Sequence, residues 1–281
     1  MLTDVARSTL FEASEYKTWD EIGNAGEAWA SMRHIATMIR SNKLKLGRRY
    51  YALTLSMGVF LAMFCNVRKI VAVEFGVGGG AGLLDLCKAA AFFRDKIGIE
   101  IEVYGLDNAT GLPSYDGYKD CPELWPKGSF YLRDPEALRA KLPSYAHLII
   151  GDIAETVGSF NDILGEDRKL GFVSVDVDYY SSTMSCLNIL KQDISCYMPV
   201  VPMYFDDLMN LHVTYNSWCG EQAAIDEFNS TNTLRKIEAA PQFNNTVRGR
   251  PYHACHMLDH PLRATDKVHR EGFRMVELRY F

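Results

Sequence analysis

The sequence lacks the features of three common classes of protein. Its longest apolar stretch, residues 51–65, is shorter than the roughly 20 residues that a membrane-spanning helix needs. Lysine and arginine are scattered through a chain of formal net charge −5, so no basic face indicates nucleic-acid binding. The seven cysteines have no paired spacing, which favours free thiols in a reducing compartment over a disulfide framework. We therefore expect neither a membrane nor a nucleic-acid partner.

The first residues also lack a basic stretch followed by an apolar core, so we expect no secretory signal peptide and a cytoplasmic protein. A length of 281 residues suits one large α/β domain with a helical appendage. Residues 1–66, with apolar residues at helical spacing, are predicted to be this N-terminal extension, and residues 67–281 the main domain. The extension could complete the core, cover the site as a lid, or form the contact of a homo-oligomer.

The chain is organised around a glycine-rich stretch. An apolar run from Ile70 to Val73 ends in Glu74, and glycines follow at positions 76, 78, 79, 80 and 82. Helical periodicity then begins at Leu83. This order predicts a strand, a tight loop and a helix, which is the opening unit of a nucleotide-binding α/β domain. Gly76 and Gly78 are expected to let the backbone approach the ligand without a Cβ clash.

Two classes of ligand use such a loop, and Glu74 distinguishes them. Dinucleotide-binding loops carry an apolar residue at this position, two residues before the first glycine. S-adenosylmethionine has an α-amino group and a sulfonium, so a carboxylate at the strand tip would meet a positive charge. The sequence therefore favours S-adenosylmethionine. An NAD-dependent oxidoreductase and a non-catalytic nucleotide-binding protein of the same fold are the alternatives.

Acidic residues follow five successive apolar segments, each predicted to be a strand. Predicted helices lie between these strands, so the pattern indicates a mostly parallel sheet with helices on both faces. Further strands are predicted at 236–239, 252–257 and 273–280. Because the carboxyl ends of parallel strands meet at one edge, the acids should share one rim. They are Glu74, Asp107, Asp152, the pair Asp176 and Asp178, and the pair Asp206 and Asp207.

The order of the acids predicts their roles. Asp107, after the second strand, is expected to bind ribose hydroxyls, and Asp152 could accept a hydrogen bond from an adenine amino group. Asp176, Asp206 and Asp207 would repel one another unless a cation lay among them, and oxygen ligands of this kind suit Mg²⁺. The alternative is that Asp207 faces away and Asp206 only caps a turn.

Several ordered motifs resemble a known family. Residues 74–80 resemble motif I of class I S-adenosylmethionine-dependent methyltransferases. More narrowly, the chain is similar to the macrocin O-methyltransferase family at residues 107–113, 125–130, 151–156, 176–183, 206–207 and 220–228. The resemblance implies a Rossmann-like class I methyltransferase sheet and methylation of a hydroxyl of a sugar or small natural product. The chain departs from the family pattern at Ala109, Thr110 and Ser181, on the acceptor side.

The resemblance also implies roles in catalysis. In the family, aspartates matching Asp176, Asp206 and Asp207 bind Mg²⁺, which holds the hydroxyl of the small-molecule acceptor. A base must then remove the hydroxyl proton. Asp176 or Asp178 could be that base. His212, five residues past Asp207, is a further candidate.

Overall fold

The computed structural model describes residues 17, 18, 20–23, 25–208, 214, 216–240 and 252–263. His212 and the strand predicted at 273–280 lie outside these residues. The helices and strands are α2 (Ala25–Arg40), α3 (Arg49–Phe64), β1 (Lys69–Phe75), α4 (Ala81–Ile97), β2 (Glu100–Asp107), α5 (Pro135–Arg139), β3 (Ala146–Ile150), α6 (Ile153–Thr156), α7 (Phe160–Ile163), β4 (Lys169–Val175), α8 (Tyr180–Cys186), β5 (Val200–Phe205), α9 (Gly220–Thr231), β6 (Arg235–Ala239) and β7 (Tyr252–Met257).

The strands form one seven-stranded sheet in the order β3-β2-β1-β4-β5-β7-β6. All neighbouring pairs from β3 to β5 are parallel, and β7 runs antiparallel to both β5 and β6. The prediction of a mostly parallel sheet is confirmed. The chain places β2 and β3 on one side of β1 and β4 and β5 on the other. Ligands of open α/β sheets bind at such a change of direction, beyond the carboxyl ends of the strands.

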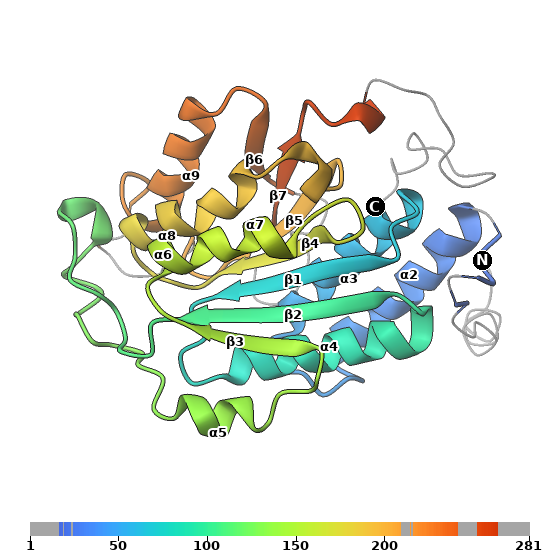
Figure 1. Cartoon of the computed structure of the whole chain (residues 1–281), viewed down its shortest axis with the longest axis horizontal. Coiled ribbons are helices and arrows are strands. Elements are labelled where there is room, and N and C mark those ends of the chain that lie inside the picture. The colour runs from blue at the N-terminus through green and yellow to red at the C-terminus, as the bar shows by residue number, and fades with distance from the viewer. Residues whose placement is uncertain are drawn as a thin grey trace, which may run out of the picture.

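Helices cover both faces of the sheet, as predicted (Figure 1). Successive side chains of a strand point to opposite faces. In β1, Ile70 and Ala72 therefore pack with α2, α3 and α4, whereas Val71 and Val73 pack with the side that carries α7 to α9. Both faces of β1 are apolar because both are covered, which explains its unbroken hydrophobic run.

Helix α3 is buried on almost every side and contacts α2, α4 and strands β1, β4 and β5. Gly58 allows this close packing, because a Cβ there would lie 2.0 Å from the carbonyl oxygen of Gly171. The apolar run at 51–65 is therefore a helix packed on the sheet. Among the described helices, none is long and apolar enough to cross a bilayer.

Backbone hydrogen bonds extend the sheet just past its strands and align the acids at one rim. The Asp176 N–H donates to the Phe75 carbonyl at 2.9 Å, and the Asp206 N–H donates to the Val175 carbonyl at 3.0 Å. The long loop of residues 108–134, green in Figure 1, extends beyond the arrowheads of β1 and β2 toward this rim.

Candidate active site

A cavity of about 610 Å³ lies at the carboxyl ends of the strands. The glycine loop forms one wall, the loop of residues 108–134 forms another, and the ends of β4 and β5 close the far side. Among the predicted site residues, those that line the cavity are Gly76, Gly78, Asp107, Asp176, Asp178, Asp206 and Asp207.

The glycine loop needs glycine for two separate reasons. Gly76, Gly78 and Gly80 have positive φ angles of 82°, 49° and 85°, a region that residues with a Cβ rarely adopt. At Gly76, a Cβ would also lie 1.8 Å from the carbonyl oxygen of Asp176. The loop after β1 therefore passes directly against the end of β4, which joins the two halves of the cavity.

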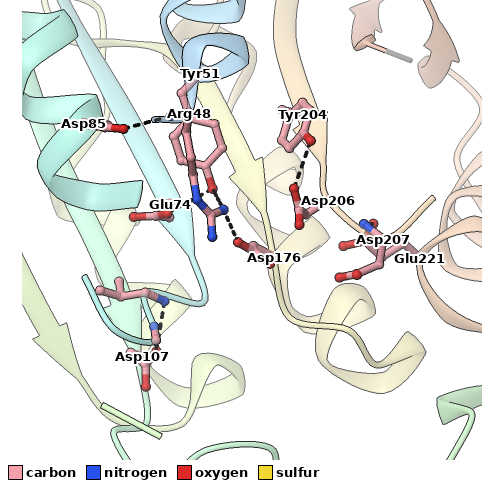
Figure 2. A network of polar contacts seen from close by, with 12 residues as sticks. Arg48, Tyr51, Glu74, Asp85, Asp107, Asp176, Tyr204, Asp206, Asp207 and Glu221 are labelled. Atoms are coloured by element: carbon pink, nitrogen blue, oxygen red, sulfur yellow. Dashed lines mark hydrogen bonds and ion pairs between the residues drawn. The ribbon is translucent and has the colours of Figure 1, made fainter. Parts of the chain in front are cut away.

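Asp107 ends β2 and supports the glycine loop (Figure 2). One carboxylate oxygen accepts from the backbone N–H groups of Val77 at 2.9 Å and Gly78 at 2.8 Å. The other accepts from Ala109 N–H at 2.6 Å. The side chain is 7% exposed and lines the cavity, so it fixes the loop and retains acceptor capacity for one more hydrogen bond.

Glu74 lies behind the cavity wall and does not line it. Its side chain is 1% exposed, and Oε1 accepts from the Tyr51 hydroxyl at 2.9 Å. No described group donates to Oε2. Burial, followed by the nearby Asp176 carboxylate, raises the pKa of Glu74 well above its usual range. Because Glu74 does not line the cavity, its predicted contact with a donor cation stays a prediction.

Asp152 is exposed and caps helix α6, where its carboxylate accepts from Ala154 N–H at 2.8 Å. The next residue, Ile153, lines the cavity instead. A contact of Asp152 with an adenine amino group stays a prediction.

The far side of the cavity is a cluster of carboxylates on the ends of β4 and β5. Arg48 Nη1 donates to Asp176 Oδ2, and the Tyr204 hydroxyl donates to Asp206 Oδ1 at 2.9 Å (Figure 2). Asp178 is 7% exposed and has a φ of +61°, an uncommon conformation for a residue with a side chain. Burial and the carboxylates of Asp176 and Asp206 raise the pKa of Asp178 to about 7.

A buried glutamate supports the second aspartate of the pair on β5. The Asp207 N–H donates to Glu221 Oε2 at 2.9 Å, and Glu221 is fully buried at the start of α9. Burial, followed by the Asp207 carboxylate, raises the pKa of Glu221 well above its usual range. Glu221 therefore fixes the backbone at Asp207 from behind the cavity wall.

The loop of residues 108–134 is tied to the acceptor side by a buried acid. Asp120, fully buried, accepts from both the N–H and the hydroxyl of Ser181, each at 2.8 Å. Asp120 also accepts from Asp116 N–H at 2.6 Å, and the Tyr179 hydroxyl donates to the Trp125 carbonyl at 2.7 Å. Ser181 is one of the departures from the family pattern, and here it anchors this loop.

Comparison with solved structures identifies the fold. The O-methyltransferase NovP has a TM-score of 0.52 and 15% identity over 76% of this chain and 79% of its own. CalS11, a calicheamicin methyltransferase, has a TM-score of 0.52 and 17% identity over 88% of this chain and 99% of its own. The fold is that of the class I methyltransferases. No protein-family model and no curated protein sequence matches the chain.

Within this methyltransferase fold, the carboxylates do not fit a magnesium ion as they lie. Among the described residues, no group of three or more His, Cys, Asp or Glu side chains is gathered closely enough to hold a metal. The guanidinium of Arg48 already contacts Asp176. A metal at the predicted ligands Asp176, Asp206 and Asp207 would require these side chains to move closer together.

Three of the residues that shape the site were not predicted as functional. Arg48 and Tyr51 come from the start of α3, and Glu221 from the start of α9. A signal for Arg48 exists, because a charged residue directly before a helix buried on almost every side needs a partner or an opening to solvent. Nothing in the sequence indicates which carboxylate that partner is.

Proposed function

We propose that the protein transfers a methyl group from S-adenosylmethionine to a hydroxyl oxygen of a small molecule. The observation that carries this proposal is a single cavity with two chemically different ends. At one end, Asp107 and the glycine loop suit a nucleoside, and at the other, Asp178 lies among further carboxylates. Fold alone would not carry the proposal, since one fold serves many functions.

The donor end is suited to a ribose and a short charged chain. Asp107 has acceptor capacity for ribose hydroxyls, and the glycine loop brings backbone close to a bound ligand. The donor supplies a methyl group on a positively charged sulfur, which is already electrophilic. The protein then has mainly to align the acceptor oxygen with the carbon–sulfur bond.

Asp178 is the proposed general base. It lines the cavity, and a carboxylate with a pKa near 7 is matched to removing a proton at neutral pH. The hydroxyl proton goes to Asp178, the acceptor oxygen bonds to the methyl carbon, and the carbon–sulfur bond breaks to leave a neutral thioether. Asp176 and Asp206 serve by raising the basicity of Asp178.

The lining of the cavity supports a neutral or cationic acceptor with a flat or ring-shaped face. Trp125, Phe130 and Tyr131 line it, and the last two are 60% and 53% exposed. Aromatic faces of this kind stack on sugar and aromatic rings. The described lining carries five carboxylates and one guanidinium, which disfavours an anionic acceptor. A sugar or natural product also agrees with CalS11, a calicheamicin methyltransferase.

Magnesium dependence stays a prediction of the family resemblance. Loss of methyl transfer in a chelator and its recovery with Mg²⁺ would support that prediction. Unchanged activity in the chelator would indicate that Asp178 and its neighbouring carboxylates remove the proton without a metal ion.

Calorimetric titration with S-adenosylhomocysteine, and with NAD for comparison, tests the donor. We expect binding of S-adenosylhomocysteine only. Transfer of a labelled methyl group to a panel of neutral glycosides and phenols then tests the reaction. Binding of NAD in place of S-adenosylhomocysteine would overturn the proposal and favour an oxidoreductase. Binding without transfer to any acceptor would favour a non-catalytic protein.

A further inference from the structure

Arg48 is held by its backbone, and part of its side chain reaches the cavity. The Arg48 N–H donates to Asp85 Oδ2 on helix α4 at 2.8 Å, which fixes the entry into α3. The side chain is 30% exposed and lines the cavity beside the glycine loop. Figure 2 shows the guanidinium beside Tyr51, in the first turn of α3, and close to Asp176, just past the end of β4.

Among the described residues, only one of the three guanidinium nitrogens of Arg48 has a hydrogen-bond partner. Nη1 donates to the Tyr51 hydroxyl at 2.9 Å and to Asp176 Oδ2. Nη2 and Nε make no hydrogen bond to a described residue. A guanidinium presents its donors as a rigid fork that matches the two oxygens of a carboxylate, so the unused nitrogens suit an anionic group of a ligand.

The charges of the residues that line the cavity favour Arg48 as the contact for a negatively charged group of a ligand. Of the described lining residues, Arg48 alone is positively charged, against five aspartates. The proposed donor carries one anionic group, the α-carboxylate of its amino-acid part. Elsewhere in the described lining, the charged side chains are aspartates, which would repel that group. The crevice between β1 and β4, where Arg48 lies, is also where the sheet changes direction and ligands extend across it.

We propose that Arg48 binds the α-carboxylate of the methyl donor and thereby selects a complete amino-acid part. This inference rests on the proposed function, since it assumes S-adenosylmethionine as the donor. Arg48 is a binding and positioning residue: it holds the end of the donor opposite to Asp107, so the two contacts fix where the reactive methyl group lies between them.

The test is a double comparison of protein and ligand. S-adenosylhomocysteine and its decarboxylated analogue, which lacks only the α-carboxylate, are titrated into the wild type and Arg48→Gln. The wild type should bind the complete compound about ten- to a hundredfold more tightly than the analogue, the range of a charged hydrogen bond of about 1.5–3 kcal/mol. Arg48→Gln should bind both equally, and the difference between the proteins isolates the contact. Arg48→Lys should recover part of the preference.

Arg49→Gln is the matched control, because Arg49 begins the same helix but donates to the Arg40 carbonyl at 2.6 Å, outside the cavity lining. It should behave as the wild type. Equal loss of both ligands in Arg48→Gln would show that Arg48 only supports the fold, and an unchanged preference would show that it does not touch the carboxylate. Either result overturns the inference. Failure of the wild type to bind S-adenosylhomocysteine would instead overturn the proposed function.

Discussion

The two halves of the cavity hold their acids in opposite ways. On the side of β1 and β2, Asp107 accepts three backbone hydrogen bonds from N–H groups at 2.6–2.9 Å. On the side of β4 and β5, Asp178 is buried against the carboxylates of Asp176 and Asp206, and its pKa rises to about 7. One carboxylate is held by backbone donors, and the other is buried against like charges.

This difference separates binding from chemistry. A carboxylate that backbone donors hold is fixed in one orientation, which suits recognition of a hydroxyl group. A carboxylate that burial and like charges disfavour takes up a proton readily, which suits a general base, and such perturbed groups cluster at functional sites. The fold supplies both at one rim because the strands of both halves end there.

Replacing the proposed base should give the clearest distinction between donor binding at one end of the cavity and chemistry at the other. Asp178→Asn should lower kcat by roughly a hundredfold to ten-thousandfold, the usual contribution of a general base. Asparagine has nearly the same shape and tolerates the positive φ of 61°, so the fold should persist. Methyl-transfer rates measure the effect, and calorimetry should find an unchanged affinity for S-adenosylhomocysteine. Retained activity would show that another group acts as the base.

Disrupting the contact between the glycine loop and the end of β4 should destabilise the fold without removing any functional side chain. Gly76→Ala sets a Cβ against the Asp176 carbonyl at a positive φ, which should destabilise the fold by about 3 kcal/mol or more. Gly79→Ala is the matched control, because Gly79 is exposed and a Cβ there meets nothing within 4 Å. Urea unfolding of both variants tests this, and equal stabilities would contradict it.

Weakening the donor end of the cavity should reduce the affinity for the donor more than it reduces kcat. In Asp107→Asn, the amide nitrogen cannot accept from the loop N–H groups, so we expect about ten- to a hundredfold weaker binding of S-adenosylhomocysteine. The free energy of unfolding should fall by about 1–3 kcal/mol for the same reason. Calorimetry and urea unfolding measure the two effects. A lower kcat at saturating donor, with unchanged affinity for S-adenosylhomocysteine, would contradict the assignment of Asp107 to donor binding.

The pH dependence sharpens the comparison further. With a chelator present, kcat/KM should rise with pH and level off above about 7, because Asp178 must lose its proton to act as a base. The sign for stability is opposite: the folded state holds this proton up to about pH 7, whereas the unfolded chain releases it near pH 4. The contribution of Asp178 to stability therefore decreases between these values as pH rises. Asp178→Asn should remove both dependences.

The fold and the rim of acids were predictable because they follow from local order. Each strand is an apolar run ending in an acid, and parallel strands bring their ends together. The direction of a side chain at that rim was not predictable. Glu74 turns toward Tyr51 and away from the cavity, into space that exists only because residue 82 is glycine, where a Cβ would lie 2.0 Å from its carboxylate.

The partner of Asp176 could not be predicted from the sequence for a similar reason. Arg48 precedes it by 128 residues, and the two meet only because α3 packs on the sheet with its first turn at the carboxyl ends of β1 and β4. The raised pKa of Asp178 likewise depends on how deeply the ends of β4 and β5 are buried. The spacing of residues along a chain predicts neither how a helix packs on a sheet nor how deeply a carboxylate is buried.

The buried contact between Asp120 and Ser181 has a consequence for the rate at which ligands enter. Moving the loop of residues 108–134 away from the cavity would deprive a fully buried carboxylate of its two donors from Ser181, a slow and unfavourable event. The entrance is therefore already formed before a ligand arrives. Association should proceed in a single phase whose observed rate rises linearly with ligand concentration, without the plateau that a rate-limiting loop movement would impose.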